Sequence, residues 1–211
     1  MIAMNKIEYL LRVYIEKVSK MPLSKTSKDA TLNKLQTYLN LWKNIQNSIE
    51  VNGNFPDKGL YCSSSIVLPE RIGTINIGWY IGDVLKNYQK YAKNSIELYS
   101  LDDLNALIGQ DVIMAQDEVK KKWKIVKSKY SHDFDYLLVV YFEPFKSYLL
   151  ADGWHKYIEY MKGYRTGKIP VVIVNSSEIT QYLFLKRHFV LYKILELIGE
   201  ILQLKEANFR E

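Results

Sequence analysis

Apolar residues recur at helical spacing in two segments near the N-terminus. Residues 7–20 and 27–49 each carry large apolar side chains three or four positions apart, which places them on one stripe of a helix. Pro22 breaks the pattern between them, and Ser27 or Asp29 is expected to cap the second helix. We expect an antiparallel pair whose apolar stripe packs inside the molecule or, alternatively, forms a homodimer surface.

Short apolar runs bounded by turn residues predict strands farther along the chain. Residues 63–68 and 73–79 flank Pro69-Glu70-Arg71 and are typical of a hairpin. Four further runs have the length and composition of strands: 95–101, 136–142, 148–151 and 169–174.

Helical segments are predicted between and after these strands. The shorter ones are 82–92, 114–128 and 154–162. Residues 179–204 are rich in Leu and Ile at helical spacing, and Ser177 is a plausible start, so we predict one long helix there. Residues 52–59 have the composition of a loop.

The pattern as a whole predicts an α/β (α+β) protein. Residues 1–94 are expected to be mainly helical with a short hairpin, residues 95–176 to form a small mixed-sheet domain, and residues 177–211 to form a C-terminal helix. A chain of 211 residues can bury such a core, and 48% apolar and 25% charged residues are typical of a globular protein.

Charge and cysteine content narrow the possible partners and metals. The net charge of +6 allows an acidic partner such as a nucleic acid, although the densest basic cluster, residues 120–129, is typical of a solvated helix face. The single cysteine, Cys62, excludes a disulfide framework and a cysteine-based metal site. The chain shows no apolar leader and no apolar run of membrane-spanning length, so we expect a cytoplasmic protein without a membrane partner.

The most informative chemistry lies where a predicted strand meets a predicted helix, in the run Asp152-Gly153-Trp154-His155-Lys156. Backbone N–H groups at a helix N-terminus attract anions, phosphate above all, and a glycine there lets a ligand approach the backbone. Lys156 could neutralise phosphate, and His155, kept neutral by the helix dipole, could act as a general base. The run therefore predicts a nucleotide or phosphate site.

Each of these residues also has a structural interpretation. Asp152 could bind Mg²⁺ or cap the helix by accepting N–H bonds. Trp154 could stack on a base or fill the core. His155 could make a structural hydrogen bond, and Lys156 could simply be solvated. The carboxylates that the fold could bring to the turn are Glu97, Glu118 and Glu143.

This segment resembles the Asp-Gly-x-His-Arg turn of the ParB/sulfiredoxin-like superfamily, in which a helix, a Gly-containing turn and an Ile-Pro-Val strand follow. The corresponding residues here are Leu150, Asp152 to Lys156, Gly163 or Gly167, and Ile169-Pro170-Val171. With the strands and helix upstream, the resemblance covers residues 95–176. Lys156 stands where the family has arginine, so bidentate phosphate recognition becomes a point charge.

The resemblance implies a ParB-like protein of a plasmid, phage or other mobile element that binds a nucleoside triphosphate or diphosphate and acts on or with DNA. Gly153, Trp154, His155 and Lys156 would hold the nucleotide. Asp152 would hold Mg²⁺ and, with His155, take part in any reaction. Two alternatives stay open: a Mg²⁺-dependent phosphotransferase or nuclease of the same superfamily, and a non-catalytic interaction or regulatory module. Cys62 lies far from the turn, which disfavours the sulfinic-acid repair of sulfiredoxins.

Overall fold

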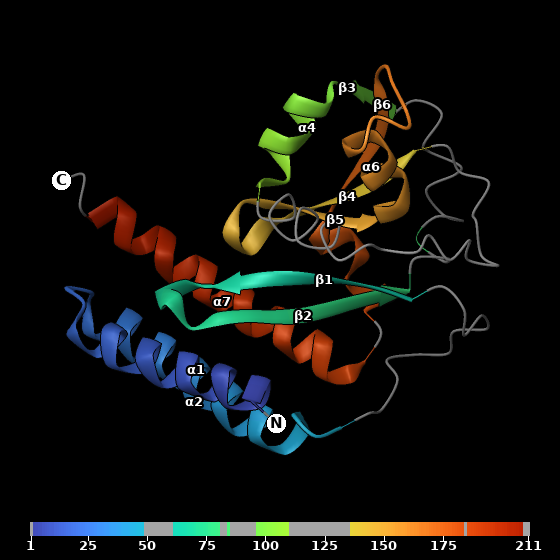
Figure 1. Ribbon diagram of the computed structural model, residues 1–211. Helices are drawn as coiled ribbons and strands as arrows, with labels where there is room; N and C mark the ends of the chain where they lie inside the picture. The colour runs from blue at the N-terminus through green and yellow to red at the C-terminus, as the bar shows by residue number, and fades with distance from the viewer. Residues whose placement is uncertain are drawn as a thin grey trace. The chain divides into compact units, whose positions relative to one another are not determined.

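The computed structural model describes residues 2–48, 61–80, 84, 96–109, 136–183 and 185–208. The chain divides into two compact units. Unit 1 comprises Met1–Gly53, Ile66–Ile77 and Leu183–Glu211, and unit 2 comprises Asn54–Ser65 and Gly78–Tyr182. The combination of helices with two small sheets confirms the predicted mixed α+β class (Figure 1).

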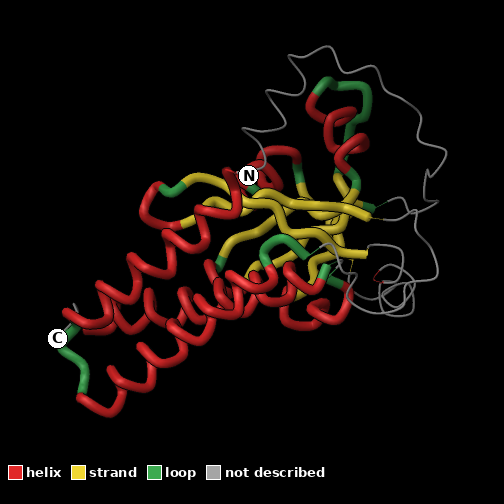
Figure 2. The backbone as a smooth tube through the Cα atoms, turned by 90° about the horizontal axis from the view of Figure 1, so that it is seen from below, coloured by secondary structure: helices red, strands yellow, loops and turns green. Residues whose placement is uncertain are grey.

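Unit 1 contains the predicted antiparallel pair of N-terminal helices. α1 (Ile2–Lys20) packs along α2 (Lys25–Ile45), and α7 (Lys186–Asn208) packs on α2 in turn (Figure 2). The apolar stripes of the pair meet in a common core, as the spacing predicted. Its fully or nearly fully buried members are Ile7, Leu10, Leu11, Tyr14, Val18, Leu35, Leu39 and Trp42.

The cap of α2 differs from the prediction. Ser24, not Ser27 or Asp29, is the N-cap, and its hydroxyl oxygen accepts a hydrogen bond from the Ser27 N–H at 3.2 Å. The helix therefore begins at Lys25, because Ser24 already satisfies one of the donors that a helix start leaves open.

The predicted single helix over 179–204 is wrong at its start. A 3₁₀ segment, η3 (Ser176–Tyr182), comes first, and α7 begins only at Lys186. The carboxylate of Glu143 accepts hydrogen bonds from the Ser177 N–H at 2.7 Å and the Ser176 hydroxyl at 3.4 Å, which ties η3 to β4 of unit 2. Leu183 and Leu185 then form isolated β-bridges, so the helix cannot run through them.

The predicted hairpin is confirmed. β1 (Tyr61–Leu68) and β2 (Gly73–Tyr80) pair in a two-stranded sheet, joined by the 3₁₀ turn η1 (Pro69–Arg71). Within unit 1 the turn is fixed to α1, because Lys17 forms an ion pair with Glu70 and the Lys6 ammonium donates to the Thr74 carbonyl at 3.2 Å.

Unit 2 contains the predicted small mixed sheet. Its strand order is β3 (Ile96–Tyr99), β6 (Ile169–Asn175), β4 (Leu137–Phe142) and β5 (Ser147–Asp152). β4 and β6 are parallel, whereas β3–β6 and β4–β5 are antiparallel. The chain passes from edge strand β5 over β4 through α6 (Trp154–Met161) to reach β6.

One face of this sheet packs on α6 and on α4 (Leu101–Leu107). The side chains buried between the sheet and these helices are Leu104, Ile108, Leu137, Val139, Leu150, Tyr157, Ile169 and Val171. The hydroxyl of buried Tyr157 donates to Asn105 Oδ1 at 2.6 Å and so links the two helices. The strands and helix predicted around the Asp-Gly turn are confirmed to within about one residue.

Several predictions fall on residues outside those described. These are the loop at 52–59, the helix at 114–128 and nearly all of the helix at 82–92. In the described part of the chain, no helix combines the length and the apolar character needed to cross a membrane.

Leu195→Ala tests the packing of α7. Leu195 is fully buried, and emptying such a position should lower the free energy of unfolding by about 2–5 kcal/mol. Leu204→Ala on the same helix removes a side chain that is 44% exposed and should change it by no more than about 0.5 kcal/mol. Chemical denaturation measures both, and equal losses would contradict the packing.

Candidate functional site

The predicted site lies at the junction of β5 and α6. β5 ends at Asp152, Gly153 takes a left-handed conformation with φ of 92°, and α6 begins at Trp154. The first hydrogen bond of the helix runs from the Tyr157 N–H to the Gly153 carbonyl at 2.9 Å. The N–H groups of a first turn point out of the helix end, and the helix dipole makes that end partly positive.

Gly153 is required by the packing of unit 2. A Cβ atom built on it would lie 2.4 Å from Leu137 Cδ2 and 3.3 Å from Leu137 Cα, and its φ favours glycine. The missing side chain faces the core at the start of β4, so any substitution changes the fold before it affects a ligand.

Asp152 bonds to the turn, and Gly153 rather than Asp152 is the N-cap residue of α6. Its Oδ1 accepts a hydrogen bond from the Gly153 N–H at 2.8 Å, and its side chain is half-buried. Gly153, the N-cap residue, has no side chain with which to accept bonds from the first turn of α6. Among the described residues, no three His, Cys, Asp or Glu side chains gather as a metal site. A Mg²⁺ ion at Asp152 would depend on phosphate and water for most of its ligands.

Tyr136 is a site residue that the sequence reasoning missed. It stands just before β4, whose Leu138 pairs with Asp152. Burial raises the pKa of the Tyr136 hydroxyl, and the negative charge of nearby Asp152 raises it further. A neutral phenol therefore lies beside the carboxylate at neutral pH. The antiparallel pairing of the two strands was the signal that could have found it, because it brings the start of one strand to the end of the next.

The three remaining residues of the run differ in exposure. His155 is exposed and Lys156 is half-buried. Trp154 packs against the core of unit 2 and contacts Tyr157 edge-on, with ring centroids 6.3 Å apart and planes at 76°. This agrees with the core interpretation of Trp154, while its stacking on a base stays a prediction.

The strands hold two of the candidate carboxylates away from the turn. Glu143 lies at the opposite end of the β4–β5 hairpin, so the length of β5 separates it from Asp152 by roughly 16–20 Å. Glu97 is on the far edge strand β3, three strand spacings or about 14 Å from β5, and accepts a hydrogen bond from the Tyr99 hydroxyl at 2.6 Å. Glu118 lies outside the described residues.

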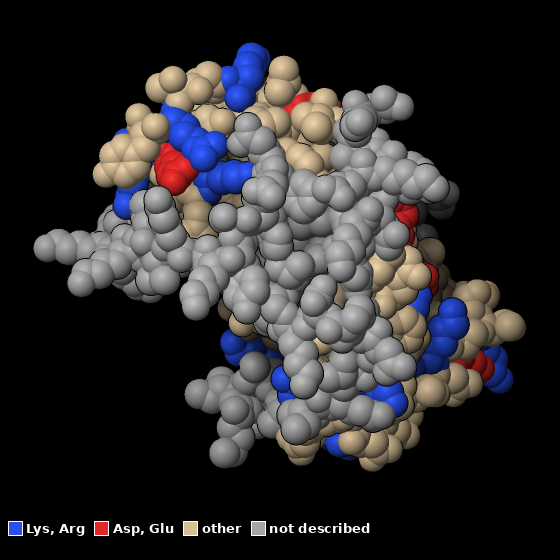
Figure 3. Space-filling model, turned by 90° about the vertical axis from the view of Figure 1, so that its right-hand side faces the viewer, with Lys and Arg blue, Asp and Glu red and all other residues tan. Residues whose placement is uncertain are grey.

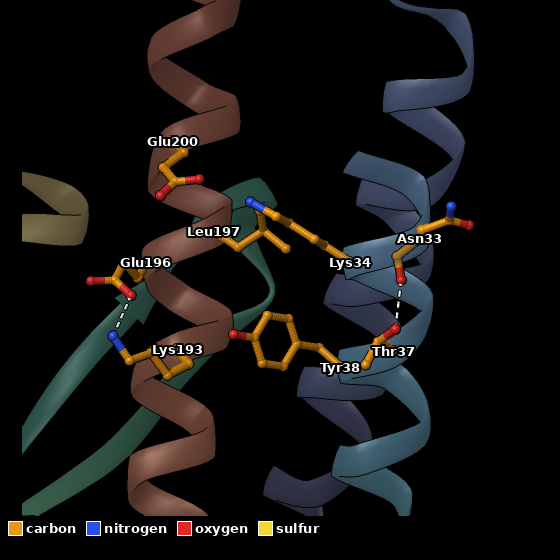
Figure 4. A pocket seen from close by; sticks show the side chains of 8 residues that line it. All are labelled: Asn33, Lys34, Thr37, Tyr38, Lys193, Glu196, Leu197 and Glu200. Carbon is orange, nitrogen blue, oxygen red and sulfur yellow. Dashed lines mark hydrogen bonds and ion pairs between the residues drawn. The ribbon is translucent and has the colours of Figure 1, made fainter. Parts of the chain in front are cut away.

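A separate groove of about 540 Å³ lies between α2 and α7 in unit 1 (Figure 4). Its lining combines two lysines with two glutamates, and one pair, Lys193 and Glu196, forms an ion pair at 2.8 Å. Balanced charges of this kind indicate no particular ligand, so the groove does not compete with the β5–α6 turn as a site. The residues drawn around it are Asn33, Lys34, Thr37, Tyr38, Lys193, Glu196, Leu197 and Glu200.

Comparisons of the chain with protein-family models, with curated proteins and with solved structures found no significant match. The interpretation of the turn therefore depends on its own geometry and chemistry.

Gly153→Ala tests the contact with Leu137. It should destabilise the protein through both the strained φ and the clash, whereas Gly167→Ala should cost only the strain, since Gly167 has φ of 94° and nothing within 4 Å of its added Cβ. We expect the loss in unfolding free energy at Gly153 to exceed that at Gly167 by about 1–3 kcal/mol. Equal losses in thermal or chemical denaturation would show that Leu137 does not press on this position.

Proposed function

We propose that the β5–α6 turn binds the phosphate of a nucleotide. The observation that carries the proposal is a helix that starts at a glycine, so that its N-cap contributes no side-chain acceptor to the first turn. Such a helix end favours an anion. Asp152 Oδ1 accepts the Gly153 N–H, which holds the carboxylate against the backbone of the turn.

Two side chains of the first turn add to this preference. Side chains on a helix lean toward its N-terminus, so Lys156 and His155 are suited to reach an anion placed there. Lys156 supplies a positive charge and His155 a donor or acceptor according to its protonation. The neutral phenol of Tyr136 adds no charge that would repel phosphate.

Nucleotide binding is better supported than catalysis. A phosphotransferase or nuclease needs a base beside the reacting atom. Strand order holds Glu97, and the length of β5 holds Glu143, away from the turn, so among the described candidates His155 would have to take that part. Asp152 is the carboxylate suited to hold a Mg²⁺ ion that accompanies the phosphates. This proposal agrees with what the resemblance to ParB/sulfiredoxin-like proteins implies.

Lys156→Ala should weaken nucleotide binding by about 1.5–3 kcal/mol, the range for a hydrogen bond to a charged group. Calorimetric titration with ATP, ADP, CTP and GTP in the presence of Mg²⁺ measures the effect. Lys25→Ala, which removes an exposed lysine of α2 in unit 1, is the control and should leave mononucleotide binding unchanged. If wild-type protein binds none of these nucleotides at millimolar concentration, the proposal is wrong and an interaction module takes its place.

Asp152→Asn separates the metal from the phosphate. The amide oxygen of asparagine can still accept the Gly153 N–H bond, so the turn should keep its shape. We expect the variant to bind nucleotide without Mg²⁺ at least as well as wild type, and to lose any gain in affinity that Mg²⁺ provides. A Mg²⁺ effect of unchanged size in the same titration would place the ion elsewhere.

A further inference from the structure

A second feature lies at the other end of α6. Residues 162–168 read Lys-Gly-Tyr-Arg-Thr-Gly-Lys and contain three basic residues and no acidic one; we name this segment the basic turn. Tyr164, its third residue, is 71% exposed, more than any other large apolar side chain in the described part of the chain. In the face drawn in Figure 3, Lys and Arg side chains appear in the upper part, with acidic side chains among them, and again in the lower part.

The basic turn has a defined backbone. The Tyr164 and Arg165 N–H groups donate to the Glu159 carbonyl at 2.9 and 3.3 Å, and Arg165 Nε donates to Glu159 Oε2 at 2.6 Å. Gly163 and Gly167 have φ of 71° and 94°, which lets the chain reverse on both sides of Tyr164. The turn therefore presents an aromatic ring to solvent from a fixed support.

Exposing a tyrosine in this way leaves apolar area in water that a partner can cover. Lys162 and Lys168 flank Tyr164 in the sequence, two residues before it and four after it, and their charges suit a polyanion. A single-stranded nucleic acid can satisfy both the exposed ring and the lysine charges. Its bases are free to stack on an aromatic ring, and its phosphates can contact the lysines. A duplex offers the phosphates but keeps its bases stacked on one another.

We propose that the basic turn binds single-stranded nucleic acid, with Tyr164 stacking on a base and Lys162 and Lys168 contacting phosphates. Arg165 acts through Glu159 as a positioning residue that holds the ring outward. α6 is eight residues long, so this contact lies about 12 Å from the proposed mononucleotide site. It does not depend on that site, and Lys156→Ala tests the latter separately.

Fluorescence anisotropy with a labelled oligothymidylate of about 20 nucleotides, longer than a typical site, tests the stacking. Tyr164→Ala should weaken binding about tenfold or more. Tyr9→Ala removes a tyrosine of α1 that is 59% exposed and should leave the affinity unchanged. Equal affinity of wild type and Tyr164→Ala, or an equal loss in both variants, overturns the proposal.

The salt dependence of the same binding tests the two lysines. Replacing both Lys162 and Lys168 by glutamine should reduce the slope of log affinity against log salt by about 1.4, or about 0.7 for each lost phosphate contact with a single strand. The pair Lys25 and Lys34, exposed on α2, provides a control with the same change in net charge and should leave the slope unchanged. A slope that falls equally in both double variants shows a general charge effect and overturns the proposal.

Two further outcomes also decide whether the basic turn binds single-stranded nucleic acid. No binding of the oligothymidylate by wild-type protein at about 50 mM salt, where such contacts are strong, overturns it. Tighter binding to a duplex of the same length, or to vesicles rich in phosphatidylglycerol, overturns it in favour of a duplex or membrane contact. Tighter binding to the single strand than to either competitor supports it.

Discussion

The contact between Gly153 and Leu137 is the constraint on which the rest of unit 2 depends. It brings the first residue of β4 close to the backbone that joins β5 to α6, so that an added Cβ would lie 2.4 Å from Leu137 Cδ2 and 3.3 Å from Leu137 Cα. Because the chain can turn there only with a positive φ, α6 leaves the edge strand at an angle that carries it over β4. The pairing of Leu138 with Asp152 brings Tyr136, two residues before Leu138, near the same turn.

Elements with a glycine or proline at or near a boundary could be predicted from the sequence. Gly153 follows the end of β5, Gly163 follows the C-cap of α6, and Pro170 is the second residue of β6. Glycine accepts left-handed backbone and proline restricts it, and these elements lie where predicted. The start of α7 could not be predicted in this way. Its delay depends on Glu143, more than thirty residues away, and on bridges at Leu183 and Leu185.

The candidate site likewise has features that the sequence shows and features that depend on tertiary structure. Asp152 to Lys156 are contiguous, so their chemistry could be found in the sequence. The direction in which Gly153 faces, and the presence of Tyr136, are tertiary properties that depend on the pairing of β4 with β5. The separation of Glu97 and Glu143 from the turn likewise follows from strand order and strand length, which residue types alone do not encode.

The proposal that an anion binds at the N-terminus of α6 is tested most directly by a two-dimensional ¹H–¹⁵N NMR titration of the intact protein with ATP and Mg²⁺. Hydrogen bonding to phosphate shifts the amide resonances of the donors, so the largest changes should fall on Trp154, His155 and Lys156. The indole resonances of Trp42 and Trp79, which are buried in other elements, should stay in place. No shifts in the first turn of α6, or larger shifts at another part of the chain, would contradict the account.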